Sequence, residues 1–261
     1  MATPRIQSVD RAFSLLAQLT DGGGSRLPML AQGAGLTVAT AHRLLATLES
    51  LGVIVRTGSS GYQLGMLVHE LAQSSSPIDV LSTTAVPLLR RLVRETGLTA
   101  HVAVLNEERM VDYVARECPS RSFRVPTRLG SQLEAYCSGL GKILLAGLSE
   151  PMLDAYVDDG PFVALTERTI VDPELLRAEL NDVSLRGYAV DDREIYDDLR
   201  CVAVPVRNGR STVIAALSLA GNTVDLTTER VPEIVALLGE QSAELSRKLF
   251  PLRPAGARLA N

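Results

Sequence analysis

The sequence predicts an α+β chain with a small N-terminal domain and a larger C-terminal domain. Three observations predict this. At 261 residues the chain is long for one hydrophobic core and comfortable for two. Patterns typical of helices and of strands alternate along most of it. A polar break, Ser74-Ser75-Ser76-Pro77, separates the two parts.

Three stretches near the N-terminus carry apolar residues at helical spacing: Val9–Leu19, Leu27–Ala31 and Ala41–Leu51. Ser8 and Thr37 precede the first and the third stretch and are candidate N-caps. The glycine after the third stretch marks its end. We therefore expect three short helices, the first and third capped by a hydroxyl side chain.

Two β-prone runs, Val53–Arg56 and Tyr62–Leu64, follow the helices and are joined by a turn rich in glycine and serine. Three helices followed by a hairpin is the order of a winged helix-turn-helix, whose third helix contacts DNA bases through its N-terminal residues. The residues expected at such an interface are Thr37, Val38, Ala39, Thr40, His42, Arg43, Arg56 and Ser59. The same pattern also fits a helical hairpin and a β-hairpin used for protein contacts.

The charges are unevenly distributed between the two parts. The formal net charge is −4. The first 73 residues carry five arginines and four acidic residues, a net charge of +1, so the remainder carries −5. A surface for double-stranded DNA is therefore expected in the N-terminal part.

A helix starting at Met66 is expected to link this part to the C-terminal domain, which gives domain boundaries of 1–65, 66–77 for the linker, and 78–250. Residues 251–261 are expected to form a disordered tail. In the C-terminal domain the patterns predict helices over 80–96, 138–148, 150–157, 173–185 and 227–249, and strands over 99–105, 110–115, 188–190, 201–207 and 213–220. This alternation predicts a central antiparallel sheet with helices around it.

Composition excludes several classes of protein. No apolar run approaches the roughly 18 residues that a membrane span needs, and the first ten residues lack the apolar segment of a secretory signal. Cys118, Cys137 and Cys201 are odd in number and widely spaced, which argues against a disulfide framework or a zinc motif. We expect a cytoplasmic protein that needs no cofactor and no metal.

Several polar residues of the C-terminal domain could line a binding site. Ser138-Gly139-Leu140-Gly141 opens a helix, where free N–H groups suit an anion such as a carboxylate. Cys201 and Ser218 lie on strands that can pair across Asn208-Gly209, and Asp191 ends another strand. The same residues could instead be a buried thiol, a hydroxyl bonded to backbone and a solvated turn.

Other functions also remain open at this stage. Cys137 or Cys201 with His101 is a conceivable nucleophile and base, although no orienting motif surrounds either cysteine. Asp191, Asp192 and Glu194 could ligate a metal, and Gly139-Leu140-Gly141-Lys142 lacks the spacing of a phosphate-binding loop. A small-molecule sensor that does not bind DNA is a third class.

Motifs in both parts resemble the IclR family of bacterial regulators. They cover about residues 5–250 in the family's order and comprise Gln7–Ala12, Gly35–Thr37, His42–Leu48, Leu51-Gly52, Gly61–Gly65, Cys137–Ala146, Arg186–Glu194 and Cys201–Val206. The resemblance implies a transcription regulator, more often a repressor, that is not an enzyme. It also implies homodimers that can pair into tetramers.

The resemblance further implies that the C-terminal domain is GAF-like and binds a small effector, often one that carries a carboxylate. It places Gly139, Leu140, Asp191, Cys201, Ser218 and Ala220 on the polar side of the pocket, and Val125, Leu133 and Leu199 on its apolar walls. Ala220 supplies no hydroxyl and Leu140 is bulky. We therefore expect an effector larger or more apolar than pyruvate.

Overall fold

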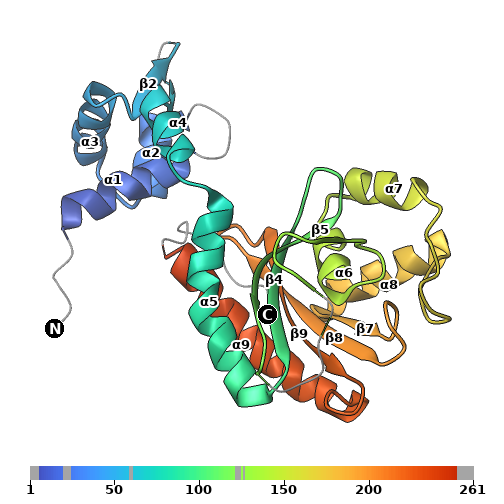
Figure 1. The fold of residues 1–261 in the computed structure, drawn as a ribbon. Helices are drawn as coiled ribbons and strands as arrows, with labels where there is room; N and C mark the ends of the chain where they lie inside the picture. Colours follow the sequence, from blue (N-terminus) through green and yellow to red (C-terminus); the bar gives the residue numbers. More distant parts are fainter. Residues whose placement is uncertain (1–5, 20–24, 59–60, 121–124, 126, 252–261) are drawn as a thin grey trace. The chain divides into compact units, whose positions relative to one another are not determined.

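The computed structural model describes residues 6–19, 25–58, 61–120, 125 and 127–251 (Figure 1). The described chain falls into two compact units, one ending at Ser76 and the other spanning Pro77–Pro251. Ser59 and the tail after Pro251, both of which carried expectations from the sequence, lie outside the described residues. None of the helices in the described ranges is both long enough and apolar enough to span a bilayer.

The N-terminal unit has the predicted order of three helices and a hairpin. Its elements are α1 (Gln7–Gln18), β1 (Ser25–Arg26), α2 (Leu27–Gly33), α3 (Val38–Ser50), β2 (Ile54–Thr57), β3 (Gly61–Leu64) and α4 (Met66–Gln73). The three strands form an antiparallel sheet in the order β1-β3-β2. Leu15, Leu30, Leu45 and Ile54 are fully buried at the centre of one core, so the helices and the wing fold as one unit.

The ends of the helices agree only in part with the sequence prediction. The Thr37 side chain accepts a hydrogen bond from the Thr40 N–H, which confirms the N-cap of α3. The cap expected from Ser8 is wrong, because α1 begins one residue earlier, at Gln7, and Ile6 occupies its N-cap position without a side-chain hydrogen bond. Leu51, expected on the buried face of α3, is 59% exposed because the helix ends at Ser50.

The C-terminal unit is built on a six-stranded sheet in the order β6-β5-β4-β9-β8-β7, and every neighbouring pair is antiparallel. This confirms the predicted central antiparallel sheet. The strands are β4 (Thr99–Leu105), β5 (Val111–Glu117), β6 (Gln132–Leu133), β7 (Ala189–Asp192), β8 (Leu199–Arg207) and β9 (Val213–Asn222). The two-residue strand β6 was not predicted, because it is too short to show a period.

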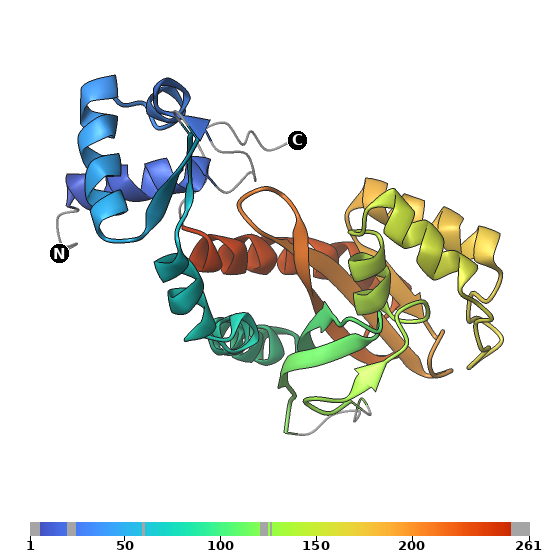
Figure 2. The ribbon, with the colours of Figure 1, turned by 90° about the horizontal axis from the view of Figure 1, so that it is seen from above.

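Helices cover both faces of this sheet (Figure 2). On one face lie α5 (Pro77–Thr96) and α9 (Val231–Leu249), the latter preceded by the short 3-10 helix η1 (Thr228–Arg230). On the other face α6 (Gly139–Leu145) packs on the strands, and α7 (Glu150–Asp158) and α8 (Pro173–Arg186) lie beyond it. Helix α5 begins at Pro77 rather than near Val80, since proline suits the first turn of a helix.

Small residues allow α6 to lie close to the sheet. Successive side chains of a strand point to opposite faces, and the face toward α6 carries Ala103, Ala189, Ala203 and Ala216. All seven residues of α6 are buried. Next to this alanine floor the same face carries larger polar residues, and these form the site described below.

Candidate functional site

One face of α3 is available to a partner of the N-terminal unit. Ala41, Leu45 and Leu48 face the core. The opposite face presents four of the residues expected to contact DNA, all of them exposed: Val38, Ala39, His42 and Arg43. Among the residues that the structure describes, Arg43 has no ion pair, so its guanidinium is available to a base or a phosphate.

Thr37 and Thr40 bond mainly to each other. The Thr37 hydroxyl donates to Thr40 Oγ1 at 2.9 Å while accepting from the Thr40 N–H. These two hydrogen bonds therefore fix the start of α3, and the Thr40 hydroxyl, which accepts from Thr37, keeps its own proton to donate to DNA.

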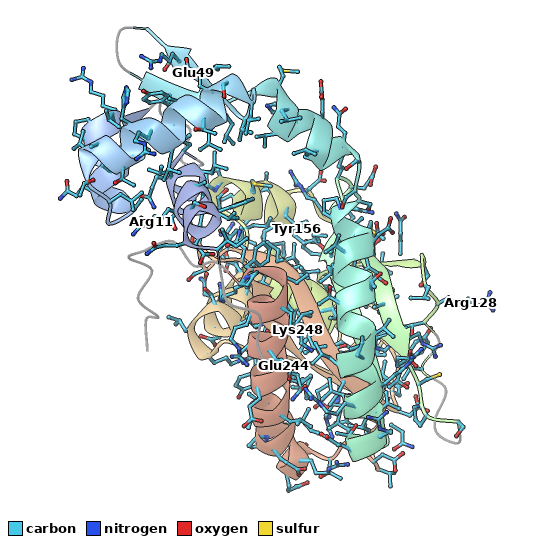
Figure 3. The ribbon with its side chains drawn as sticks, turned by 90° about the vertical axis from the view of Figure 1, so that its left-hand side faces the viewer. Arg11, Glu49, Arg128, Tyr156, Glu244 and Lys248 are labelled. Carbon is cyan, nitrogen blue, oxygen red and sulfur yellow. The ribbon has the colours of Figure 1, made fainter. Side chains whose placement is uncertain are left out.

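Arg56 of the wing is held in place by neighbouring side chains. Its Nε lies 3.1 Å from both carboxylate oxygens of Glu49, which Figure 3 labels near the end of α3. Its guanidinium also lies 5.4 Å from the centre of the Tyr62 ring. The sequence did not indicate this pairing, which partly neutralises the positive charge expected at the wing.

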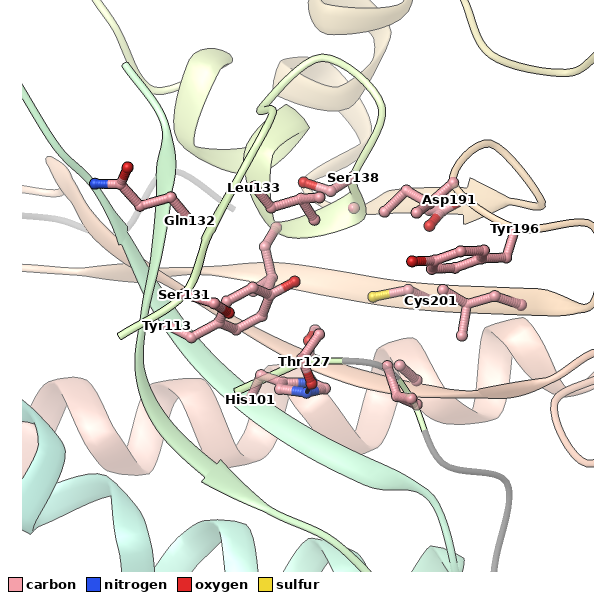
Figure 4. Close-up of a pocket in the computed structure, with 17 residues that line it drawn as sticks. His101, Tyr113, Thr127, Ser131, Gln132, Leu133, Ser138, Asp191, Tyr196 and Cys201 are labelled. Carbon is pink, nitrogen blue, oxygen red and sulfur yellow. Dashed lines mark hydrogen bonds between the residues drawn. The ribbon is translucent and has the colours of Figure 1, made fainter. Parts of the chain in front are cut away.

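The C-terminal unit contains a cavity of about 230 Å³ between the sheet and the start of α6 (Figure 4). All nine residues that the sequence assigned to an effector pocket line it: Val125, Leu133, Gly139, Leu140, Asp191, Leu199, Cys201, Ser218 and Ala220. Val125, Leu199, Cys201 and Ala220 form a small apolar cluster along one wall, with Ile195 packed against it.

Strand register explains why residues so distant in sequence meet here. Cys201 pairs with both Asp191 and Ala220, and Ser218 pairs with His101. Because these positions share one face of the sheet, four neighbouring strands supply the floor of the cavity. The expectation that Cys201 and Ser218 face one cavity is thereby met.

Two buried polar atoms in the floor lack a partner within the described ranges: Asp191 Oδ2 and Ser218 Oγ. Both side chains are fully buried, and Figure 4 shows the Asp191 carboxylate directed toward the cavity. The other carboxylate oxygen, Oδ1, accepts a hydrogen bond from the Glu194 N–H at 2.7 Å. Since buried polar groups are almost always hydrogen-bonded, these two atoms are available to a bound molecule.

Burial raises the pKa of Asp191 to about 7. The Glu194 N–H and the charge of Lys142 oppose this rise, whereas the charge of Glu194 adds to it. Asp191 can therefore accept a hydrogen bond as a carboxylate or donate one as a carboxylic acid near neutral pH.

Sequence reasoning missed the polar groups at the other end of the cavity. His101 Nε2 lies 2.8 Å from Thr127 Oγ1, and the ring packs against Tyr113. Burial and the nearby Arg116 lower the pKa of His101 to about 3, so the ring is neutral. Figure 4 shows the hydroxyl groups of Tyr113 and Tyr196 pointing toward each other across the cavity.

The start of α6 offers fewer N–H groups than the sequence indicated. The Gly141 N–H donates to the Ser138 hydroxyl at 2.9 Å, and Gly141 does not line the cavity. A Cβ at Gly141 would lie 2.1 Å from the Ala135 carbonyl oxygen, so this glycine is required for packing. Gly139 and Leu140, whose N–H groups lie in the first helical turn, remain at the cavity.

The geometry is unfavourable for the nucleophilic and metal-binding alternatives. Burial raises the pKa of both Cys137 and Cys201 to about 12, which keeps the thiols protonated, and the buried His101 is a weak base. The nearby Ser218 hydroxyl partly offsets the rise in the pKa of Cys201. The geometry of the two groups falls short of a hydrogen bond, so Ser218 Oγ has no partner among the described residues.

The acidic residues considered for a metal are engaged by cations. Asp192 is bonded to Arg200 and Arg168, and Glu194 to Lys142. In the ranges that the structure covers, no group of three potential ligands is placed to hold a metal ion.

A winged helix-turn-helix joined to a domain with a cavity lined by polar and apolar side chains defines the class of ligand-responsive transcription regulators. Comparison with known proteins identifies the family. Residues 8–58 match the IclR helix-turn-helix domain, and residues 73–247 match the domain described as bacterial transcriptional regulator IclR C-terminal. The chain belongs to the IclR family of bacterial transcriptional regulators.

Individual relatives align over nearly the whole chain. The Escherichia coli transcriptional repressor IclR is 32% identical over 252 residues, which cover 94% of this chain and 90% of that protein. The crystal structure of a regulator assigned to the family from Silicibacter sp. TM1040 matches with a TM-score of 0.74 at 26% identity, covering 96% of this chain and 98% of that one.

A third relative was crystallised with a ligand. An IclR homologue from Microbacterium hydrocarbonoxydans, in complex with 4-hydroxybenzoate, matches with a TM-score of 0.62 at 25% identity. The alignment covers 93% of this chain and 98% of that one.

Proposed function

We propose that this protein is a repressor whose binding to operator DNA is controlled by a small hydroxylated organic acid held in the C-terminal cavity. The observation that carries the proposal is the pair of buried polar atoms, Asp191 Oδ2 and Ser218 Oγ, which have no partner among the described residues. They lie in a cavity that combines several polar side chains with one apolar wall. A pocket with a few converging polar groups is typical of small-molecule sites.

The polar groups favour a particular ligand chemistry. A ligand hydroxyl can donate to Asp191, and Ser218 can donate to a ligand oxygen. Among the described lining residues none carries a full positive charge, so a ligand carboxylate would rely on neutral donors such as Ser138, Tyr113 and the N–H groups of Gly139 and Leu140. These donors and the apolar wall favour an acid with an apolar body over a very small, highly polar one.

The relatives support the same ligand chemistry and a role in repression. One solved homologue holds 4-hydroxybenzoate, an acid with an apolar ring and a hydroxyl group. A relative from Escherichia coli that is 32% identical is named as a transcriptional repressor. We infer that this chain also represses and that it works in the cytoplasm, where operator DNA is accessible.

We further propose that the protein binds DNA as a dimer. Ile6, Val9 and Phe13 form an apolar stripe on α1 that is about half exposed or more, and Met66 and Leu71 are exposed on α4. Exposed apolar side chains at helical spacing are typical of protein contacts. A symmetric dimer would present two copies of α3 to the two halves of an operator. Pairing of dimers into tetramers remains a proposal from the family resemblance.

A binding experiment tests the ligand proposal. 4-Hydroxybenzoate, benzoate and pyruvate are compared by thermal shift with the wild-type chain, Asp191→Asn and Ser218→Ala. At 100 times its dissociation constant a ligand stabilises the folded state by about 2.7 kcal/mol. We expect 4-hydroxybenzoate to stabilise the wild-type chain most, and both variants to reduce the effect. Equal stabilisation of the wild-type chain and both variants would place the ligand elsewhere.

A further inference from the structure

Lys142 of α6 is a buried cation that lies behind the cavity without lining it. Its side chain is 1% exposed. The ammonium group donates to the Val190 carbonyl oxygen at 3.0 Å, is hydrogen-bonded to the Glu194 carboxylate, and lies 3.7 Å from Glu179 Oε1. A buried lysine needs such partners, because its charge is costly away from water.

Two of these contacts bind Lys142 to strand β7, through Val190, and to the turn that follows it, through Glu194, whereas Glu179 belongs to α8. The Glu194 N–H donates to Asp191 Oδ1, and the Glu194 carbonyl oxygen accepts from the Thr169 hydroxyl at 2.6 Å. Asp191, Ile195 and Tyr196 of the same segment line the cavity. Lys142 therefore ties α6, the helix at one side of the cavity, to the segment that carries three cavity residues.

We propose that Lys142 is a positioning residue of the effector site: together with Glu194 it holds the turn after β7 in place, and its buried charge favours the carboxylate form of Asp191 over the neutral acid that burial favours. The inference rests on the proposed function, because it assigns the ligand preference of that cavity. With a charged Asp191 the cavity selects hydrogen-bond donors such as hydroxyls. With a neutral Asp191 it also accepts ligand acceptors such as a second carboxylate.

The groups around Asp191 allow the effect of Lys142 to be separated from the others. The groups that face Asp191 or lie next to it are Lys142, Glu194, Cys137, Cys201, Tyr113, Tyr196 and Asp192. Asp192 is itself paired with Arg168, Arg193 and Arg200. Glu179 lies near Lys142 and acts on Asp191 through it. The two thiols and Tyr113 are uncharged at neutral pH because burial raises their pKa values. Asp192 is neutralised by its arginines. Lys142 and Glu194 are thus the nearby charges to change, and because Lys142 lowers the pKa of the buried Glu194, the effect of Lys142 on Asp191 is isolated only when Glu194 has been replaced by Gln.

The two charges act on Asp191 in opposite directions. The charge of Lys142 lowers the pKa of Asp191, and the charge of Glu194 raises it. Removing the charge of Glu194 should therefore favour the carboxylate, and removing Lys142 as well, with Glu194 already replaced by Gln, should shift Asp191 back toward the neutral acid. A purely structural role predicts the same direction for both changes, since each would loosen the same turn.

The test uses the full-length chain without ligand. The free energy of unfolding of the wild-type chain and of Asp191→Asn is measured in urea from pH 5 to pH 9. Because the pKa of Asp191 is raised in the folded state, the wild-type chain loses stability as pH rises from the ordinary aspartate value of 3.8 through about 7. Asp191→Asn lacks this loss, so the difference between the two reports the titration of Asp191.

The same pair is then compared in three backgrounds: Lys142→Arg, Glu194→Gln and the double variant Lys142→Met/Glu194→Gln, in which Glu194 can no longer titrate. We expect the titration midpoint to stay near the wild-type value in Lys142→Arg, to fall in Glu194→Gln, and to rise again when Lys142→Met is added to Glu194→Gln. A midpoint that is the same with and without Lys142 in the Glu194→Gln background, or that falls further without it, overturns the proposal. If Lys142→Met/Glu194→Gln does not fold, Lys142→Gln/Glu194→Gln replaces it with the same expected result.

This measurement is independent of the ligand experiment. Failure of 4-hydroxybenzoate to bind would affect the proposed function and leave the titration result standing. Unmoved midpoints would remove the role of Lys142 and leave ligand binding by the cavity untouched.

Discussion

Two glycines at the start of α6 have different structural roles, and a pair of alanine substitutions separates them. A Cβ at Gly139 would lie 3.4 Å from Cys201 Sγ and 3.5 Å from Ala203 Cβ, which are ordinary contacts. A Cβ at Gly141 would lie 2.1 Å from the Ala135 carbonyl oxygen and 2.4 Å from its Cα, which requires the backbone to move. Gly139→Ala is thus the matched control for Gly141→Ala.

These distances set the expected change in the free energy of unfolding of each variant. Replacing glycine by alanine inside a helix gains up to about 1 kcal/mol in helix propensity, and overpacking a buried site costs about 1–3 kcal/mol or more. Because the contact at Gly141 is with backbone at 2.1 Å, we expect the cost to exceed this range and Gly141→Ala to lose about 2–3 kcal/mol net. Gly139→Ala should stay within about 0.5 kcal/mol of the wild-type chain. With about 2–4 °C per kcal/mol for a domain of this size, Gly141→Ala should melt roughly 4–12 °C lower.

Urea unfolding and calorimetry of the two variants measure the difference. A Gly141→Ala variant as stable as Gly139→Ala would refute the assignment of Gly141 to packing. It would return Gly141 to the group of glycines that could serve a ligand.

Further predictions concern the DNA surface, the cavity and assembly. Arg43→Ala should weaken operator binding by about 1–3 kcal/mol if the arginine contacts a base. If it contacts a phosphate, the slope of log affinity against log salt concentration should fall by about one. A gel shift at several salt concentrations distinguishes the two contacts. Glu49→Gln should release Arg56 from its ion pair and raise operator affinity. The increase should be no more than a few-fold, since exposed ion pairs contribute about 0–1 kcal/mol. A loss of operator affinity in low salt would count against phosphate binding by Arg56. Ser218→Ala should leave the free energy of unfolding nearly unchanged or higher, because its hydroxyl has no partner in the described structure, and a large loss in urea would show a structural bond. Phe13→Glu should shift the chain toward the monomer in sedimentation, and an unchanged dimer would remove α1 from the interface.

Much of the fold was predictable because its signals are local. The Thr37 cap, the helical spacing of α3 and the strand pairing around Asn208-Gly209 each depend on a few neighbouring residues. The prediction failed at the start of α1. Ser8 is a good capping residue, yet the helix extends past it to Gln7.

The cavity residues were predictable in a different way. Register and alternation placed Cys201 and Ser218 on one face, and the family resemblance supplied the rest. Tyr113 and Thr127 were missed, and His101 was considered only as a possible base, because no local pattern shows that β4, β5 and the segment before β6 converge. A lone histidine in an apolar strand is most often an ordinary core residue.

The buried charge of Lys142 could not have been read from the sequence either. A lysine in a short helix is normally a solvated side chain, and its partner Glu194 is 52 residues away. The pairing of Arg56 with Glu49 was hidden for the same reason, since it depends on how the wing folds back toward α3.

We propose that a ligand in the C-terminal cavity changes the affinity of the N-terminal unit for DNA. Operator binding by fluorescence anisotropy tests this, with and without the hydroxy acid that gives the largest thermal shift, for the wild-type chain and Gly139→Val. We expect a 5- to 150-fold change in operator affinity for the wild-type chain, corresponding to about 1–3 kcal/mol of coupling. We expect little or no change for Gly139→Val, whose side chain would add bulk beside Cys201 and Asp191 of the cavity, and normal operator binding by this variant without ligand. An equal response of both proteins, or no response of the wild-type chain to an acid that binds it, would contradict the proposal.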